Sequence, residues 1–466
     1  MKAVKKITAA IAAGACLVGM AACGGSSNAG STDLTYSGIK LGETGKDIKT
    51  TISLYTNRTD MLQSNYPGTS WKQYLAAFNK MYPNITVKIT GGTNYADSAA
   101  TRLQGNSWGD IMMIPDSIDK SDLGTYFLSY GKTDEVGKLV NFASNKAYDD
   151  NVYGIASVGN GKGIVYNKKV FKEAGIDKLP TTPKQFIADL KLVKEKTSAI
   201  PLYTNYAAGW TMGAWDDYMG STSTGDAKYW NQELPHTKNP FSDPGDGTHA
   251  YNVYKILYDA VSEGLTESDY STTDWESSKT KMNNGQIATM ALGSWAVSQM
   301  QAAGSHASDV GYMPFPISVK GKQYSTEGAD YSFGINKKTS KDNQKASMIF
   351  VKWMTEKSGF SYNEGCLPVA KDITKLPAVY SDFTKNNVKF VIDEPALKGE
   401  EDLFSDLNSD SELALASNGN SRVQAIVENA STKKMSYDDM VKQWNSKWNA
   451  ALKTENVDVK YDTVVK

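Results

Sequence analysis

The sequence shows no excess of either charge and no long apolar run beyond its first residues. Its 466 residues include 50 basic and 51 acidic side chains, which give a formal net charge of −1. Because no positive field results, nucleic acid is excluded as a partner. No apolar stretch after residue 22 is long enough to cross a membrane. A chain of this length is instead expected to form two domains or one large bilobed unit.

An export signal is predicted at the N-terminus. Three lysines among the first six residues precede an uncharged run at 7–22, which is too short to span a membrane but fits a secretory signal. The residues Met20-Ala21-Ala22-Cys23 resemble a bacterial lipobox, in which the cysteine receives lipid and becomes the new N-terminus. We therefore expect residues 1–22 to be a lipoprotein signal peptide and 23–46 a flexible tether. Lipidated Cys23 would anchor the protein on the extracytoplasmic face of the cell membrane.

Cysteine and histidine are scarce, with three residues of each. Cys16 leaves with the predicted signal and Cys23 takes the lipid, so Cys366 is the lone cysteine of the exported part. That part has no internal disulfide and must hold together by its hydrophobic core, which a chain of this length can build. None of the histidines stands in an obvious catalytic motif. Aromatic residues are abundant by contrast, and 10 Trp and 26 Tyr suit the binding of amphipathic ligands.

Strand and helix patterns alternate along the chain. The strand-like segments are 51–56, 85–89, 111–114 and 200–203, and the helical ones are 71–78, 95–103, 250–263, 341–357 and 437–452. This order indicates parallel βα units and an α/β fold. A glycine-rich break at 159–163 is predicted to be a hinge or a turn, and a second α/β lobe is expected to begin near residue 165. In that lobe Thr182, Pro183 and Gln185 predict a helix start with a capping box.

Four stretches resemble, in the same order, the motifs of extracellular solute-binding proteins that serve carbohydrate ABC importers, the maltose-binding class. They are 163–183, 285–295, 331–353 and Gly365-Cys366-Leu367-Pro368. Each motif alone is loose, but all four together with a lipobox are specific. The chain departs from the family pattern at Thr182-Pro183 and at Gly109-Asp110, so the substrate is not copied from a relative.

The resemblance implies an α/β, two-lobed periplasmic-binding-protein-like fold with a hinge and an interlobe ligand cleft. Lobe one would comprise 47–158 plus 318–358, and lobe two 164–312 plus 359–466. The chain would cross between the lobes near 159–163, 313–317 and 359–368. Closure by hinge motion would then trap a ligand in the cleft.

The candidate binding residues follow predicted strands or match the family motifs. Trp295 follows a strand-like run at 287–292 and matches the position where the family's tryptophan stacks on a sugar ring. Sugar C–H faces lie on aromatic planes, while hydroxyl groups need carboxylates and amides. Core packing is the alternative for the aromatic residues, and a solvated loop is the alternative for the polar ones. The expected set is Trp295, Trp210, Trp215, Tyr206, Asn57, Asp60, Trp108, Asp116, Asp330 and Tyr331.

Catalysis and metal binding find little support in the sequence. The stretch 105–109 spells a nucleophile elbow around Ser107, but an elbow needs a strand before and a helix after, and the predicted order is reversed. Asp406, Asn408 and Asp410 have the spacing of a calcium loop, but serine occupies the positions that need glycine and glutamate. We expect no catalytic residue, no cofactor and no bound metal.

The sequence thus predicts a non-enzymatic, lipid-anchored, extracellular solute-binding protein. It would capture a carbohydrate, with an oligosaccharide favoured, and deliver it to the membrane permease of an ABC importer. The expected partners are the carbohydrate, the permease subunits and the membrane through the N-terminal lipid, and the expected state is a monomer. Two alternatives stay open: a binding protein for another solute such as a peptide, and a surface glycoside hydrolase lipoprotein.

Overall fold

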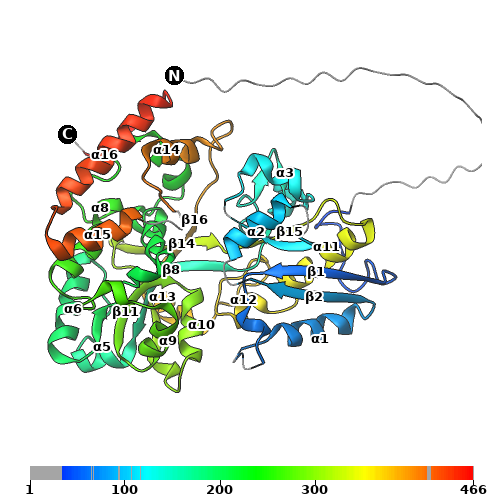
Figure 1. Ribbon diagram of the computed structural model, residues 1–466, viewed down its shortest axis with the longest axis horizontal. Helices are drawn as coiled ribbons and strands as arrows, with labels where there is room; N and C mark the ends of the chain where they lie inside the picture. The colour runs from blue at the N-terminus through cyan, green and yellow to red at the C-terminus, as the bar shows by residue number, and fades with distance from the viewer. Residues whose placement is uncertain are drawn as a thin grey trace, which may run out of the picture. The chain divides into compact units, whose positions relative to one another are not determined.

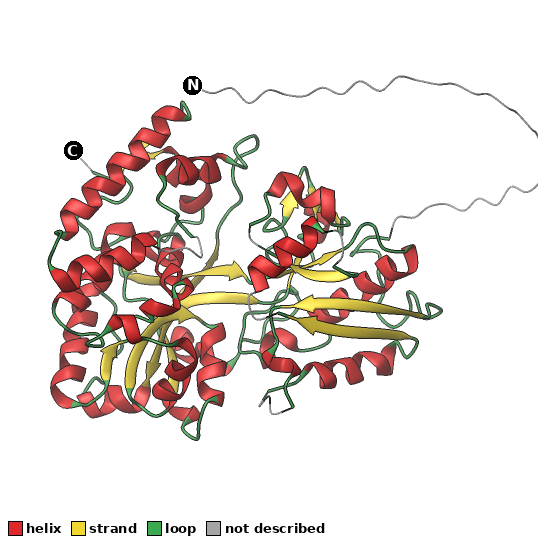
Figure 2. Cartoon of the chain, in the orientation of Figure 1, coloured by secondary structure: helices red, strands yellow, loops and turns green. Residues whose placement is uncertain are grey.

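Two main sheets, each flanked by helices, make up the compact unit Thr35–Lys466 (Figure 1, Figure 2). The computed structural model describes residues 34–64, 66, 68–92, 95–105, 108–115, 117–416 and 421–464. The predicted α/β two-lobed fold is confirmed. The predicted signal peptide, Cys23 and the start of the tether lie outside the described residues.

Lobe one is built on a five-stranded sheet. Its order is β2 (Ile85–Gly91), β1 (Thr50–Thr56), β3 (Ile111–Ile114), β15 (Ser332–Ile335) and β7 (Ile155–Ala156). β1 pairs in parallel with β2 and β3, while β15 runs antiparallel to β3 and β7. The parallel strands β1 and β3 therefore end at the same edge of the sheet. Loops that follow such ends are where ligands bind in α/β sheets.

The helices of lobe one form because their apolar residues recur at helical spacing. In α1 (Trp71–Met81) the inner stripe is Trp71, Tyr74 and Phe78, and Ser70 caps the helix in a capping box with Gln73. The other helices are α2 (Tyr95–Gln104), α3 (Leu123–Tyr126), α4 (Thr133–Val136), α11 (Lys341–Glu356) and α12 (Phe360–Asn363). A small sheet of β4 (Gly131–Lys132), β6 (Asn151–Val152) and β5 (Ala147–Tyr148) completes the lobe.

Lobe two is built on a seven-stranded sheet. Its main path is β13 (Ser318–Val319), β14 (Lys322–Ala329), β8 (Gly159–Asn167), β11 (Ile287–Gly293) and β9 (Ile200–Leu202). β12 (Val310–Pro314) also pairs with β8, and β16 (Lys389–Ile392) pairs with β14. Every residue of β11 is buried, so this strand lies at the centre of the lobe.

Helices surround this second sheet (Figure 2). The hydroxyl of Thr182 accepts a hydrogen bond from the backbone amide of Gln185, as predicted for the helix start. The Gln185 side chain, however, accepts from the amide of Thr181 and not from that of Thr182, so the second bond of the capping box is shifted by one residue. The helices are α5 (Lys168–Ala174), α6 (Pro183–Lys196), α7 (Ser221–Thr224), α8 (His249–Ser262), α9 (Trp275–Asn283), α10 (Trp295–Ala302), α13 (Ser381–Lys385), α14 (Leu403–Ser411), α15 (Ser421–Thr432) and α16 (Tyr437–Thr454). The short strands β10 (Thr237–Lys238) and β17 (Tyr461–Asp462) pair near the C-terminus.

Two strands cross between the sheets side by side. β8 follows β7 of lobe one, and β14 leads back to β15, with Gly161 opposite Glu327 and Gly159 opposite Ala329. Residues 318–329 thus pair in the sheet of lobe two. The ring of Phe360, the first residue of α12, stacks on Trp71 of lobe one with ring centroids 5.6 Å apart. The division of the chain into lobes at particular residues stays a prediction.

The glycine-rich stretch 159–163 is a strand and not a turn. It forms the first half of β8 because close neighbours leave no room for side chains there. A β-carbon on Gly161 would lie 2.9 Å from the ring of Tyr380. The glycines are therefore needed for close packing at the crossing and not for their conformational freedom.

The calcium-like spacing at 406–410 also has another explanation. These residues belong to α14, so they present their side chains at helical intervals and form no calcium loop. Within the described ranges, no group of three or more His, Cys, Asp or Glu is placed to hold a metal ion. None of the described helices has the length and apolar character needed to cross a membrane.

Candidate functional site

Three tryptophans from separate segments of lobe two converge on one surface. Trp210 begins the 3-10 segment η4 (Trp210–Tyr218), Trp275 begins α9 and Trp295 begins α10. Their ring centroids lie 5.4–5.7 Å apart in all three pairs. Trp210 is 40% exposed and the other two are half-buried. We call these residues the tryptophan triad, and it offers indole faces to a flat apolar ligand surface.

The backbone around Trp295 fixes the orientation of its ring. A β-carbon on Gly293 would lie 2.7 Å from the indole nitrogen of Trp295, so a side chain at this position is incompatible with the observed ring. Ser294 is the residue directly before α10, and its side chain does not cap the helix. The Ser294 hydroxyl instead bonds Asn160, with Oγ 3.3 Å from Oδ1, and accepts from the Gly161 amide.

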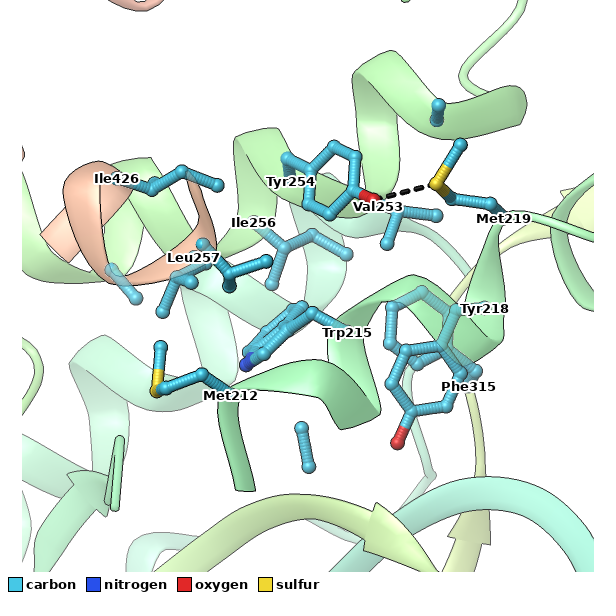
Figure 3. Close-up of a cluster of buried hydrophobic side chains, with 14 of the residues drawn as sticks. Met212, Trp215, Tyr218, Met219, Val253, Tyr254, Ile256, Leu257, Phe315 and Ile426 are labelled. Carbon is cyan, nitrogen blue, oxygen red and sulfur yellow. Dashed lines mark hydrogen bonds between the residues drawn. The ribbon is translucent and has the colours of Figure 1, made fainter. Parts of the chain in front are cut away.

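Trp215 does not belong to this surface, although the sequence grouped it with Trp210. It is 2% exposed and packs edge-on against Tyr218 and Phe315 in the core of lobe two (Figure 3). A 3-10 segment places residues five apart on different sides, so Trp210 reaches the surface while Trp215 points into the core. Core packing, the alternative that the sequence left open, describes Trp215.

Tyr206 lies beside the triad region but directs its hydroxyl elsewhere. Its oxygen donates to the carboxylate of Glu428 on α15, and its ring contacts Tyr270 with centroids 4.6 Å apart. Burial, followed by the hydrogen bond to Glu428, raises the pKa of Tyr206 to about 12. This hydroxyl therefore holds α15 against the 3-10 segment at 206–208.

On lobe one, a charged network lies in the loop after β1. Arg58 makes a bidentate ion pair with Asp60, at 2.9 Å and 2.8 Å, and also donates to Glu364 at 2.8 Å. Tyr66 donates to the same Glu364 oxygen at 2.7 Å and accepts from Arg58. Asp60 was predicted as a binding residue, whereas Tyr66 and Glu364 were not.

The burial and the charges of this network act on the pKa values of Arg58 and Tyr66. Burial opposes the charge of Arg58, but the carboxylates of Asp60 and Glu364 outweigh it and raise the Arg58 pKa further. Burial also raises the pKa of the Tyr66 hydroxyl, which stays a protonated donor. The second oxygen of Glu364, Oε1, is buried and has no partner among the described residues. A buried acceptor without a partner is rare in folded proteins, so Glu364 is a candidate ligand contact, but a hydroxyl group reaches Oε1 only when the side chains that cover it move.

The network and the triad both lie near the place where the two lobes join. A β-carbon on Gly365, the residue after Glu364, would lie 3.8 Å from the side chain of Ser298 on α10. The side chain of Asn160, which contacts Ser294, donates a hydrogen bond to Asp330, with Nδ2 2.9 Å from Oδ2. Asp330 directly follows β14, the other crossing strand. A ligand between the triad and Glu364 would therefore touch both lobes, as a ligand in a hinged cleft does.

The remaining predicted residues of lobe one have different positions. Trp108 is 5% exposed and packs edge-on against Phe127, so it belongs to the core of this lobe. Asn57 is half-buried in the loop between β1 and Arg58. Tyr331 is half-buried, with its ring edge against Tyr95 at 5.4 Å. Asp116 and Ser107 lie outside the described residues.

A cavity of about 320 Å³ lies along the other face of β8. Neighbouring residues of a strand point to opposite faces, so Gly161 faces Ser294 while Lys162 lines this cavity. The lining is charged, and Lys162 pairs there with Asp217 at 2.6 Å. Burial raises the pKa of Asp393 in the same cavity to about 6. The cavity has one tryptophan, Trp230, in its lining and lacks the cluster of three that distinguishes the first site.

Sequence reasoning missed Trp275, Tyr66 and Glu364 as members of the site. Trp275 follows a helix-capping aspartate, which is an ordinary helix start and carries no functional signal. Glu364 directly precedes Gly365-Cys366-Leu367-Pro368, a stretch already recognised as a motif, and an acidic residue beside it was the available signal. Tyr66 is brought to Glu364 only by the tertiary fold.

Two α/β lobes joined by crossing strands, with aromatic and hydrogen-bonding groups where they meet, define a bilobed ligand-binding protein. The family model for bacterial extracellular solute-binding protein matches residues 63–359. The chain belongs to this family.

Solved structures of Bifidobacterium animalis subsp. lactis proteins resemble this chain along most of its length. A manno-oligosaccharide specific solute-binding protein, in complex with mannotriose, is 56% identical with a TM-score of 0.87, and the match covers 91% of this chain and 99% of that one. The binding protein of an ABC transporter in complex with mannobiose is 57% identical with the same TM-score and coverage. A multiple sugar-binding protein of Streptococcus mutans is 24% identical over 319 residues, which cover 66% of this chain and 72% of that protein.

Proposed function

We propose that the protein captures manno-oligosaccharides outside the cytoplasm and delivers them to the permease of an ABC importer. The observation that carries this proposal is the 56% identity, over 91% of the chain, to a manno-oligosaccharide specific binding protein. At this identity the residues of a binding cleft are expected to be largely shared. A peptide or another solute is less consistent with this similarity.

The proposed mode of binding uses both lobes. A sugar ring stacks on the tryptophan triad through its C–H face, while its hydroxyl groups bond Glu364, Arg58 and Asp330. Closure of the lobes then excludes water, which strengthens these hydrogen bonds. The three indoles supply most of the apolar contact, and the charged network sets the orientation of the sugar.

Binding without catalysis is part of the proposal, as is lipid anchoring through Cys23. The family and the similar structures are transport binding proteins. A hydrolase would need a positioned acid and base at the scissile bond. The carboxylates Asp60 and Glu364 are instead bound to one arginine, which suits holding a ligand and not proton transfer.

Calorimetric titration tests the function directly. We expect mannobiose and mannotriose to bind with a dissociation constant in the micromolar range or below, and maltotriose and a tripeptide to give no heat. Chromatography of the incubated sugars should show them unchanged. Tight binding of the peptide, no binding of any manno-oligosaccharide, or release of mannose would contradict the proposal.

Anchoring has its own test because Cys23 lies outside the described residues. Replacement Cys23→Ala should move the protein from the membrane fraction to the medium or leave the precursor uncleaved. Normal processing and membrane retention of the variant would contradict lipid attachment at this position.

A further inference from the structure

A polar groove runs along lobe one beside the charged network. It is formed by the loop after β1, the outer side of α1 and the edge strand β2, and its volume is about 950 Å³. Its lining residues include Leu62, Gln63, Ser64, Tyr66, Lys72 and Ala76. Most of these side chains are exposed, so the groove is open to solvent along its length.

Tyr66 belongs to both the groove and the candidate site. Its ring lines the groove, while its hydroxyl donates to Glu364 at 2.7 Å and accepts from Arg58 at 2.9 Å. A ligand group that bonds Glu364 therefore lies within one side chain's length of the groove. Tyr66 is thus the residue that the groove and the candidate site share.

The lining has the chemistry that recognises a sugar chain. Within the part of the chain that the structure describes, the side chains of Gln63, Ser64 and Lys72 have no hydrogen-bond or ion-pair partner, so their donors and acceptors are available to a ligand. Gln73 uses its Oε1 atom to bind Ser70, which leaves its amide nitrogen for a partner in the groove. Leu62, 43% exposed, supplies an apolar surface for a C–H face.

We infer that this groove is an extension subsite that binds the further sugar units of a manno-oligosaccharide whose first units lie between the tryptophan triad and Glu364. The inference rests on the proposed function and concerns chain length. Mannobiose and mannotriose are short enough to fit within the cleft, whereas longer chains pass Tyr66 and enter the groove. Affinity then rises with chain length beyond the trisaccharide.

Two neighbouring alanines of α1 provide a matched pair of variants. Ala76 and Ala77 are both exposed, but Ala76 lines the groove and Ala77 does not. The indole of Ala76→Trp would project into the groove and obstruct it, while that of Ala77→Trp would lie outside it. Because neither side chain is buried, both variants should melt within a degree or two of the unmodified protein in the absence of sugar, in line with the small effects of surface substitutions.

Titrations with mannotriose and mannohexaose then separate the subsite from the main site. The unmodified protein should bind mannohexaose about tenfold more tightly than mannotriose, which is the effect of two or three additional hydrogen bonds. Ala76→Trp should remove this preference and leave mannotriose binding intact, while Ala77→Trp should keep both. Gln63→Ala should lower the preference by about threefold, the effect of one hydrogen bond.

The other outcomes are equally informative. Equal affinity of the unmodified protein for the two sugars, or a preference that survives Ala76→Trp, would overturn the extension subsite while leaving the proposed function in place. If Ala76→Trp lowered the affinity for both sugars equally, the groove would be part of the main site and its role as an extension would be overturned. Failure of mannotriose to bind the unmodified protein would overturn the proposed function and this inference together.

Discussion

Trp215 and Trp295 lie in the same lobe, yet the fold uses them in opposite ways. Trp215 is 2% exposed in a core of Met, Tyr and Phe side chains (Figure 3), whereas Trp295 is half-buried beside two other tryptophans at the junction of the lobes. The first residue packs in the core of lobe two, and the second has an exposed face that we propose binds the sugar. The same residue type therefore serves folding or binding according to the exposure that the backbone gives it.

The acidic neighbours Asp216 and Asp217 repeat this contrast. Asp216 is 1% exposed, accepts from Tyr254 at 2.6 Å and pairs with the buried Arg422. Asp217 is 40% exposed and pairs with Lys162 across the charged cavity. Two consecutive residues of η4 thus differ as the two tryptophans do, because the backbone turns one inward and the next outward.

The largest expected effect is the loss of the core tryptophan. Trp215→Ala should lower the free energy of unfolding by about 3–5 kcal/mol, since it removes a buried indole and leaves a cavity. The melting temperature without sugar measures this loss. A variant that melts like the unmodified protein but no longer binds mannotriose would show that Trp215 is a binding residue, and it would contradict the different roles assigned to Trp215 and Trp295.

A comparable loss is expected from the buried acid. Asp216→Ala leaves the Arg422 charge buried without its partner, which costs about 3–5 kcal/mol of stability. Asp217→Ala serves as the control, because an exposed ion pair contributes about 0–1 kcal/mol. Chemical denaturation measures both values, and equal losses in the two variants would contradict the assignment of Asp216 to the core.

The triad should show the opposite pattern. Trp295→Ala should weaken mannotriose binding by about 1–3 kcal/mol, by analogy with aromatic stacking on nucleic-acid bases, while melting without sugar changes little. Calorimetric titration and apo melting measure the two quantities. A large drop in apo melting with affinity preserved in the folded fraction would assign Trp295 to the core.

The smallest expected effect is a pH dependence of stability that comes from the buried carboxyl of Asp393. Burial raises the pKa of Asp393 to about 6, above its value of about 3.9 in the unfolded chain. The folded state therefore binds this proton more tightly, and the contribution of Asp393 to stability falls as the pH rises from about 4 to about 6. Asp393→Asn should remove that fall, so the variant gains stability relative to the unmodified protein at pH 7 and not at pH 4.

Chemical denaturation of Asp393→Asn and of the unmodified protein at the two pH values checks this expectation. An identical pH profile for Asp393→Asn and the unmodified protein would contradict a raised pKa at this carboxyl.

Most of the fold followed from local sequence patterns. The strand at 111–114 and the helix that begins after Ser70 were predicted because apolar periodicity and helix capping act within a few residues. The alternative of a turn at 159–163 was wrong, since the close approach of Tyr380 that demands glycine comes from a distant segment, while the hinge at this crossing stays a prediction.

The candidate site depended more on contacts between distant segments. Trp295 was predicted from a motif, and Asp60 from its position after a strand. Tyr66 and Glu364 are nearly 300 residues apart in the chain, and only the packing of α12 on α1 brings them together. The exposure that separates Trp210 from Trp215 is likewise a tertiary property, and the spacing of aromatic residues along one segment does not contain it.

The central claim is that the sugar lies between the tryptophan triad and Glu364. A crystal structure of the protein with mannotriose tests this claim most directly. The account predicts a mannose ring stacked on Trp295 or Trp210, with hydroxyl groups within hydrogen-bonding distance of Glu364 or Arg58. Density for the sugar in the charged cavity beside Lys162 and Asp393, with the triad unoccupied, would contradict it.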